Sequence, residues 1–414
     1  MLTISVRRSL RVALLGLAIG TIVASAWSQT RYLHDSPGNW KPWKPFSAVA
    51  SSRTEQAASA AQVTAFETEL VALNAILKRA PGVAAPVGFS VETWGHLAGY
   101  RLREHAPDQP ARGTMPIAGA LTFGAFPIFE YTRNGKIVRE DSGETALLQF
   151  VVNDIGPGVL DSGNVSEWGD VDHDAFRQPM PNGEIAGLPR YGDGAVIARN
   201  PEALWAPLPL GGALELIALN RRNIVSGFKE TLDKFTRQVA ALRDPAKRAQ
   251  RAKATRDASV NMPNPAGFIA QMEEAARAEE ASLEREISPA GSAGKGFADA
   301  QRALEEVTAW LAELPPAGRA APSCYAEAGK SLRAKFREAP DRGCVPLVRP
   351  NYAYFNKALP RSAPQVVIVT PINRCFDTAN KNNTEANSSS PAACQANRHL
   401  LETLDKEAVR AWLR

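Results

Sequence analysis

The hydrophobic residues between Thr54 and Arg79 recur at steps of three and four, which places them on one face of a helix. The pattern ends at Pro81-Gly82, a pair that terminates helices. We therefore predict an amphipathic helix whose apolar face is buried against another element. The residues of that face are Val63, Phe66, Leu70, Leu73 and Leu77.

Strand-type alternation follows this helix. Residues 96–103 and 117–126 are rich in strand-forming residues, and Asn134-Gly135 separates two alternating runs in IFEYTRNGKIVRE. Asn-Gly at this position indicates a hairpin with a type I′ turn, because both turn residues need positive φ. Together with the apolar run 145–153, these segments predict an antiparallel sheet that the preceding helix covers.

A long helical pattern begins at Leu210 and continues to about Thr255, with a break near Asp244-Pro245. After a turn, a second helix is expected over 267–287. The first helix is rich in Lys and Arg and the second in Glu. We therefore predict an antiparallel helical hairpin with complementary charges along its flanks. Surface ion pairs contribute under about 1 kcal/mol each, so they would select the pairing more than stabilise it.

The remaining pattern predicts a third helix over 297–314, a strand over 365–370 and a terminal helix over 399–413. The predicted fold class is α+β, with an antiparallel sheet packed by an N-terminal helix, an extended antiparallel helical hairpin and a disulfide-stapled C-terminal segment. The strand over 365–370 can join the first sheet, in which case the helices are an insertion in the sheet domain.

These patterns divide the chain into five parts. The predicted parts are a signal peptide (1–26), a Pro/Trp-rich N-terminal arm (27–53), an α+β sheet domain (54–205), a helical section (206–314) and a cysteine-containing segment (315–414).

The N-terminus predicts export. Three early arginines precede an apolar run over 12–23 and the small residues Ala24-Ser25-Ala26, the three-part order of a secretory signal. The run is shorter than the roughly 20 residues of a membrane-spanning helix. We expect a periplasmic or secreted protein, with an uncleaved membrane anchor as the alternative. The net charge of +5 is mild and does not indicate nucleic-acid binding.

The cysteines agree with export. Cys324, Cys344, Cys375 and Cys394 all lie in the last quarter of the chain. An even number of cysteines in an exported chain indicates disulfides. A metal site is not indicated, because the sequence contains no C-x-x-C pair. Three pairings are possible. The favoured pairing joins nearest neighbours, Cys324 with Cys344 and Cys375 with Cys394.

Residues 155–201 are rich in Gly, Pro and Asp and predict a long irregular stretch with one short strand at 195–198. Within it, the sequence WGDVDHD contains a candidate metal site. Alternating aspartates can turn several carboxylates toward Ca²⁺, and a histidine would suit Zn²⁺. The candidate ligands are Asp170, Asp172, His173 and Asp174.

The spacing of this loop favours a solvated acidic turn over a metal site. An EF-hand would need Gly where Ala175 stands and Glu where Pro181 stands. A zinc site would need His96 or His105 from the sheet domain. We therefore expect no cofactor, with Ca²⁺ or Zn²⁺ at this loop as the alternative.

The N-terminal arm contains NWKPWKPF, in which Trp40, Trp43 and Phe46 recur every third residue. Polyproline II has three residues per turn, so the three aromatic side chains would share one edge and Lys41 and Lys44 another. An apolar edge of this size needs a partner. The partner is either the domain that follows or an external surface such as peptidoglycan, the membrane interface or another subunit.

No nucleophile elbow, phosphate-binding loop, dinucleotide fingerprint or closely spaced histidine pair occurs in the sequence. We therefore assign no catalytic residue. The composition is typical of bacteria, and the preferred hypothesis is an exported cell-envelope protein that binds or scaffolds another envelope protein or peptidoglycan without catalysis. The alternative is a metal-dependent periplasmic hydrolase centred on the Asp170–Asp174 loop. The ligand and the oligomeric state stay open.

Overall fold

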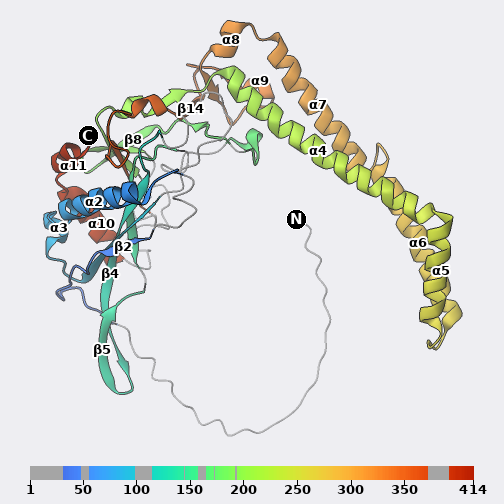
Figure 1. Ribbon diagram of the computed structural model, residues 1–414, viewed down its shortest axis with the longest axis horizontal. Coiled ribbons are helices and arrows are strands. Elements are labelled where there is room, and N and C mark those ends of the chain that lie inside the picture. The colour runs from blue at the N-terminus through green and yellow to red at the C-terminus, as the bar shows by residue number, and fades with distance from the viewer. Residues whose placement is uncertain are drawn as a thin grey trace.

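The computed structural model describes residues 31–47, 56–97, 114–143, 145–156, 165–171, 173–191, 194–371 and 391–414. The predicted signal peptide lies outside these ranges, as do His105, Asp172 and Cys375. The described chain forms a body built on a large sheet, from which a long helical hairpin projects (Figure 1). The predicted α+β class, with its helix-covered sheet, helical hairpin and C-terminal disulfide, is confirmed.

The body contains a ten-stranded sheet with the order β2-β3-β4-β6-β15-β10-β9-β8, and β1 and β5 also pair with β4. Its pairs are antiparallel except for β2 with β3. The strands are β1 (Arg31–Tyr32), β2 (Lys44–Ser47), β3 (Phe89–Leu97), β4 (Gly119–Arg133), β5 (Lys136–Asp141), β6 (Ala146–Val152), β8 (Pro181–Ile185), β9 (Leu188–Tyr191), β10 (Gly194–Ala198) and β15 (Val366–Pro371).

The turn between β4 and β5 has the predicted residues and conformation. Asn134 has φ of 52° and Gly135 has φ of 73°. Both values lie in the left-handed region that a type I′ turn requires.

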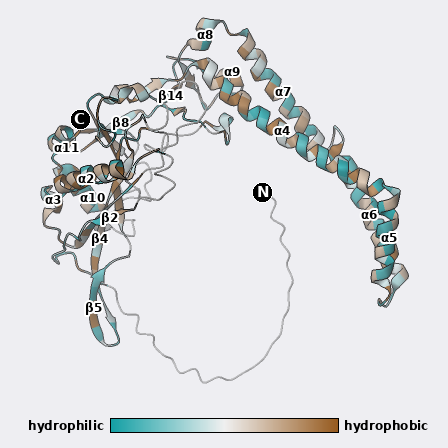
Figure 2. Ribbon diagram, in the orientation of Figure 1, coloured by the Kyte–Doolittle hydropathy of each residue, from teal (hydrophilic) through white to brown (hydrophobic). Residues whose placement is uncertain are grey.

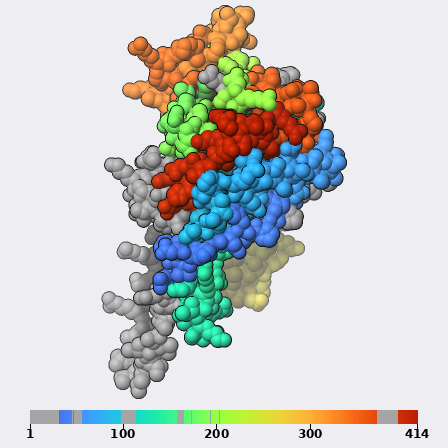
Figure 3. Space-filling model, turned by 90° about the vertical axis from the view of Figure 1, so that its left-hand side faces the viewer, coloured from blue at the N-terminus to red at the C-terminus, as the bar shows by residue number. Residues whose placement is uncertain are grey.

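Four helices cover one face of the sheet: α2 (Ala60–Leu77), α3 (Pro81–Ala84), α10 (Pro391–Thr403) and α11 (Lys406–Trp412). Figure 3 shows α2 beside the C-terminal helices across this face. The predicted apolar face of α2 is buried, with Phe66, Leu70, Leu73 and Leu77 fully enclosed in the largest core cluster. A capping box of Ser59 and Gln62 fixes the start of this helix.

The opposite face of the sheet packs against a second, five-stranded sheet and its connections. This smaller sheet consists of β7 (Phe176–Arg177), β11 (Trp205–Pro207), β12 (Ser323–Tyr325), β13 (Phe336–Glu338) and β14 (Val345–Pro350). Trp205 and Phe176 contribute to the cluster between the two sheets. Short helices complete this region: η1 (Ser166–Trp168), η2 (Pro201–Leu204), α8 (Pro316–Ala320), α9 (Leu332–Lys335) and η3 (Tyr352–Tyr354).

The helical hairpin consists of residues 210–313. Helices α4 (Leu210–Arg243) and α5 (Pro245–Ser259) run outward, and α6 (Pro265–Ile287) and α7 (Ser292–Glu313) return. At 1.5 Å per residue, α4 alone is about 50 Å long. The predicted third helix is therefore part of the same hairpin, because α7 packs along α4.

Two local predictions were wrong. The segment expected to be irregular contains the predicted short strand, β10, but also β7, β8 and β9, and the turn residues Ala186 and Gly187 between β8 and β9 both have positive φ. Of the strand expected over 96–103, only His96 and Leu97 lie among the described residues, where they end a strand that begins at Phe89. The expected terminal helix is two helices, because Asp405 caps a new helix through a bond to the Ala408 amide.

Candidate functional site

The base of the helical hairpin is anchored in the body. Leu214 and Ile217 of α4 lie in one buried cluster with Val307 and Trp310 of α7, and this cluster extends to Phe336 in the small sheet. Figure 2 shows hydrophobic positions concentrated on α4 and α7 near this base. The packing of this cluster fixes the orientation of the helical hairpin relative to the small sheet.

The distal half of the helical hairpin has almost no core. No residue of α6 is buried, and Ser259 is the one buried residue of α5. Apolar side chains near the tip are exposed, with Val260 at 73%, Met262 at 38% and Met272 at 44%. Two helices side by side enclose no interior comparable to that of a bundle, so these side chains remain in contact with solvent.

Ion pairs set the register of the distal hairpin. Arg243 bonds to Glu280 at 2.7 Å and also pairs with Glu284, and Arg248 bonds to Glu280 at 3.0 Å. The hydrogen bond from Arg243 lowers the pKa of the Glu280 carboxyl below its ordinary value. The predicted charge complementarity therefore exists, between the junction of α4 with α5 and the second half of α6.

The break between α4 and α5 is also stabilised by arginines. Asp244 caps α5 by accepting a bond from the Lys247 amide, and Pro245 occupies the first helical position, where it needs no amide hydrogen. Arg248 and Arg251 donate to the Leu242 carbonyl, and Arg251 also donates to the Ala241 carbonyl. These bonds satisfy carbonyls that the end of α4 leaves without helical partners.

The candidate metal loop packs on α4 through its tryptophan. Trp168 is fully buried, donates from Nε1 to the Ala213 carbonyl at 3.2 Å and contacts the His173 ring edge-on at 4.7 Å between centroids. Asp170 is exposed, whereas Asp174 is half-buried.

The structure does not bring a metal-ligand set together in its described part. No group of three or more His, Cys, Asp or Glu residues is placed to hold a metal ion there. Asp172 lies outside the described residues. His96 is half-buried in β3, where burial lowers its pKa, and its backbone lies opposite Ala120. The Ca²⁺ or Zn²⁺ site and the hydrolase hypothesis therefore stay predictions.

A buried polar cluster beside this loop was missed by sequence reasoning. Glu167, 9% exposed, forms an ion pair with Lys335 and accepts a bond from the Ser166 hydroxyl at 3.0 Å. Burial would raise the pKa of Glu167, but hydrogen bonds from Lys335, Tyr325 and Ser166 outweigh it and lower that pKa. Burial raises the pKa of the Tyr325 phenol. The cluster connects η1 with the small sheet. It could not be predicted from a local pattern, because Glu167 and Lys335 are 168 residues apart in the sequence.

The aromatic side chains of the N-terminal arm contact the protein's own core. Trp40 donates from Nε1 to the Val83 carbonyl at 2.8 Å and meets the Phe123 ring edge-on at 5.9 Å. Trp43 and Phe46 pack against the same cluster, with Phe46 edge-on to Phe66. In the structure all three are partly buried by the body.

The lysines of NWKPWKPF neutralise a buried carboxylate. Lys41 and Lys44 both form ion pairs with Glu92, which is 7% exposed on β3, and Lys41 also bonds to Asp141 at 2.8 Å. A charged side chain at such a position needs paired charges. The aromatic and basic edges therefore both face the body.

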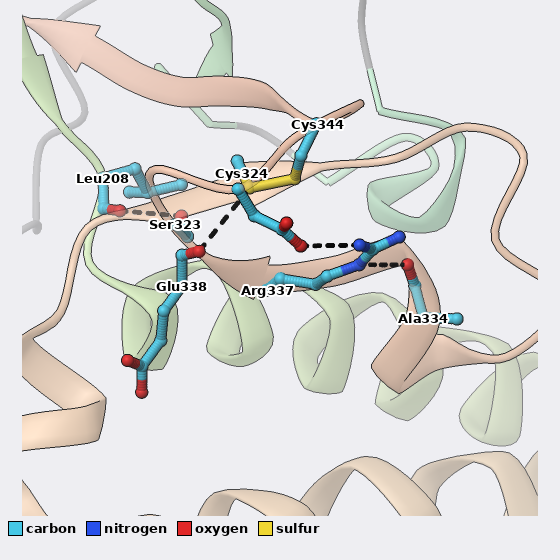
Figure 4. Close-up of a disulfide and its surroundings, with 8 residues drawn as sticks. Leu208, Ser323, Cys324, Ala334, Arg337, Glu338 and Cys344 are labelled. Carbon is cyan, nitrogen blue, oxygen red and sulfur yellow. Dashed lines mark hydrogen bonds and ion pairs between the residues drawn. A yellow bond between two sulfur atoms is a disulfide. The ribbon is translucent and has the colours of Figure 1, made fainter.

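One predicted disulfide is described in full. Cys324 and Cys344 are joined, with 5.5 Å between their Cα atoms, and the bond links β12 to the start of β14 (Figure 4). The neighbouring Ser323 donates to the Leu208 carbonyl just before α4. Cys394 is also disulfide-bonded. Disulfides are typical of oxidising compartments. Among the described helices, none is both long enough and apolar enough to span a membrane.

Comparisons with known proteins add no relative. A scan against protein-family models, a search of curated proteins and a search of solved structures all find no match for this chain.

Proposed function

We propose that this chain is an exported bacterial cell-envelope protein that binds a partner without catalysis, and that the distal helical hairpin carries the binding surface. The observation that carries the proposal is a contrast in packing. No residue of α6 is buried, whereas the base of the helical hairpin and the body are well packed. Most helix stability in proteins comes from packing of an amphipathic face. A partner on α5 and α6 would supply that packing.

Two further observations support a binding role. The tip of the helical hairpin lies far from the body (Figure 1), where a partner could contact it without contacting the body. The Cys324–Cys344 disulfide and the signal-like N-terminus favour an oxidising compartment outside the cytoplasm.

Export is tested on full-length protein expressed in a bacterial host. We expect the periplasmic fraction to contain a chain that begins at Trp27, as read from its intact mass. A full-length, membrane-bound mass would instead support the uncleaved anchor.

Binding is tested by placing a photo-crosslinking amino acid, p-benzoylphenylalanine, on the exposed surface of the hairpin at Ala254 or Gln271. The control carries it at Lys357, which is exposed on the body. We expect a discrete crosslinked product, identified by mass spectrometry, from the hairpin positions only. Equal labelling from all positions, or none from the hairpin, would contradict the proposal.

A further inference from the structure

One face of the large sheet carries a row of uncharged polar side chains that crosses four neighbouring strands. Trp94 of β3 lies opposite Thr122 of β4, which in turn lies opposite Gln149 of β6. Gln149 lies opposite Thr370 of β15. Residues directly opposite each other point to the same face of a sheet, so these four side chains form one line, which we call the polar row. At about 4.8 Å between neighbouring strands, the polar row is about 14 Å long.

The polar row lies beside the cluster between the two sheets, on the face that the four helices do not cover. The adjacent set of opposite residues is apolar and belongs to that cluster: Ala120, Val151 and Ile368. His96 is two residues from Trp94 on β3, so its side chain points to the same face as the polar row. The apolar packing of this face therefore ends at the polar row.

The hydrogen-bonding groups of the polar row are largely unused. Gln149 donates to the Thr122 hydroxyl at 3.5 Å, which is a weak hydrogen bond. The Trp94 indole, the His96 ring and the Thr370 hydroxyl form no hydrogen bond within the part of the chain that the structure describes. These three side chains and Gln149 are half-buried. Half-buried polar groups of this kind are free to bind a ligand that brings matching donors and acceptors.

The charges around the polar row favour a neutral ligand. Glu92, on the same face of β3, forms ion pairs with Lys41 and Lys44, and Lys41 also pairs with Asp141. Two lysines and two carboxylates balance one another, so these groups leave no unpaired charge for an ionic ligand. Burial lowers the pKa of His96 below its ordinary value, so its ring is neutral at pH 7 and both donates and accepts.

We infer that the polar row binds a neutral saccharide, with one sugar ring stacked on Trp94 and sugar hydroxyls bonded to Gln149 and Thr370. The flat indole offers an apolar surface to the C–H face of a sugar ring. Amide and hydroxyl groups both donate and accept, as sugar hydroxyls do. An apolar ligand would instead cover these groups and leave them unpaired, which is unfavourable. The length of the polar row suits a short oligosaccharide.

The test is isothermal titration calorimetry of the purified full chain with cellotriose, maltotriose and triacetylchitotriose, three neutral trisaccharides. We expect at least one of them to bind with a Kd below about 1 mM. Trp94→Ala should weaken that binding about tenfold or more, because the stacking surface is lost. Gln149→Leu and Thr370→Val keep the approximate size of the side chain but remove its hydrogen bonds, and each should weaken binding about three- to tenfold.

Two variants on the far part of β4 are matched controls. Tyr131 is a half-buried aromatic residue stacked on Phe129, and Thr132 is exposed, so both lie in the same sheet but outside the polar row. Tyr131→Ala and Thr132→Val should leave saccharide binding unchanged. Circular dichroism and thermal unfolding verify that every variant folds like the parent.

A parent chain that binds none of the three trisaccharides would overturn the inference. Folded Gln149→Leu and Thr370→Val variants that bind as tightly as the parent would also overturn it, as would Tyr131→Ala weakening binding as much as Trp94→Ala. Adenosine tests a neutral ring compound of another class, and its binding to the polar row in place of the saccharides would be equally decisive against the inference. The polar row lies on the body, so none of these results depends on whether the helical hairpin crosslinks to a partner.

Discussion

Ile368 in β15 lies directly opposite Val151 in β6, although the whole helical hairpin separates the two residues in the sequence. On its other side Ile368 lies opposite Val196 in β10. A strand from near the C-terminus thus fills the middle of the large sheet. The helical hairpin is therefore an insertion between strands of one sheet. That sheet is complete only when β15, which follows the hairpin in the sequence, lies between β6 and β10.

This position predicts a large effect for Ile368→Ala. The side chain is fully buried in the cluster between the two sheets, so truncation loses apolar contacts and leaves a cavity. We expect the free energy of unfolding to fall by about 2–5 kcal/mol, measured by urea denaturation. Ile137→Ala, at a residue that is 76% exposed, should change it little. Similar losses in the two variants would contradict the central placement of β15.

The two tryptophans of the N-terminal arm predict opposite responses to the same substitution. Trp40 donates its indole hydrogen to the Val83 carbonyl, so Trp40→Phe should cost about 1 kcal/mol for the lost bond. The Trp43 indole nitrogen is buried with no hydrogen-bond partner among the described residues. Trp43→Phe removes an unsatisfied donor and should leave stability unchanged or higher. Thermal unfolding of the two variants compares them directly, and a larger loss for Trp43→Phe would be inconsistent with this docking.

Glu167 predicts a pH-dependent contribution to stability. Its pKa in the folded chain lies below the ordinary value of 4.5, because the hydrogen bonds from Lys335 and its neighbours outweigh burial. The stabilisation is therefore present above the unfolded pKa and is lost as the pH falls through the folded pKa. The stability difference between the parent and Glu167→Gln should be largest near neutral pH and shrink in acid.

Urea denaturation at a series of pH values measures that difference. Glu407→Gln is the control, because the Glu407 side chain is 78% exposed, and it should stay close to the parent throughout. A difference for Glu167→Gln that is constant down to acidic pH would show that the carboxylate charge does not stabilise the fold.

Periodic and local signals predicted much of this fold. The apolar positions of α2, the Asn134-Gly135 turn and the break at Asp244-Pro245 each depend on residues close in sequence, and each was found. The β8–β9 hairpin was missed because its turn begins with Ala186, a residue type seldom found at positive φ.

The contacts of the candidate site were harder to predict. The Glu167–Lys335 pair joins residues far apart in the sequence, and β2 pairs with β3 in parallel through a Pro-containing segment. Neither leaves a local pattern.

Two glycines provide a test of backbone conformation alone. A Cβ added at Gly135 or at Gly143 would meet no atom within 4 Å, but Gly135 has φ of 73° and Gly143 has no positive φ. Gly135→Ala should therefore cost about 1–2 kcal/mol for the left-handed conformation. Gly143→Ala should be neutral or stabilise by up to about 1 kcal/mol, because it restricts the unfolded chain. Chemical denaturation of both variants measures the contrast, and equal effects would show that the β4–β5 turn does not hold its type I′ geometry in solution.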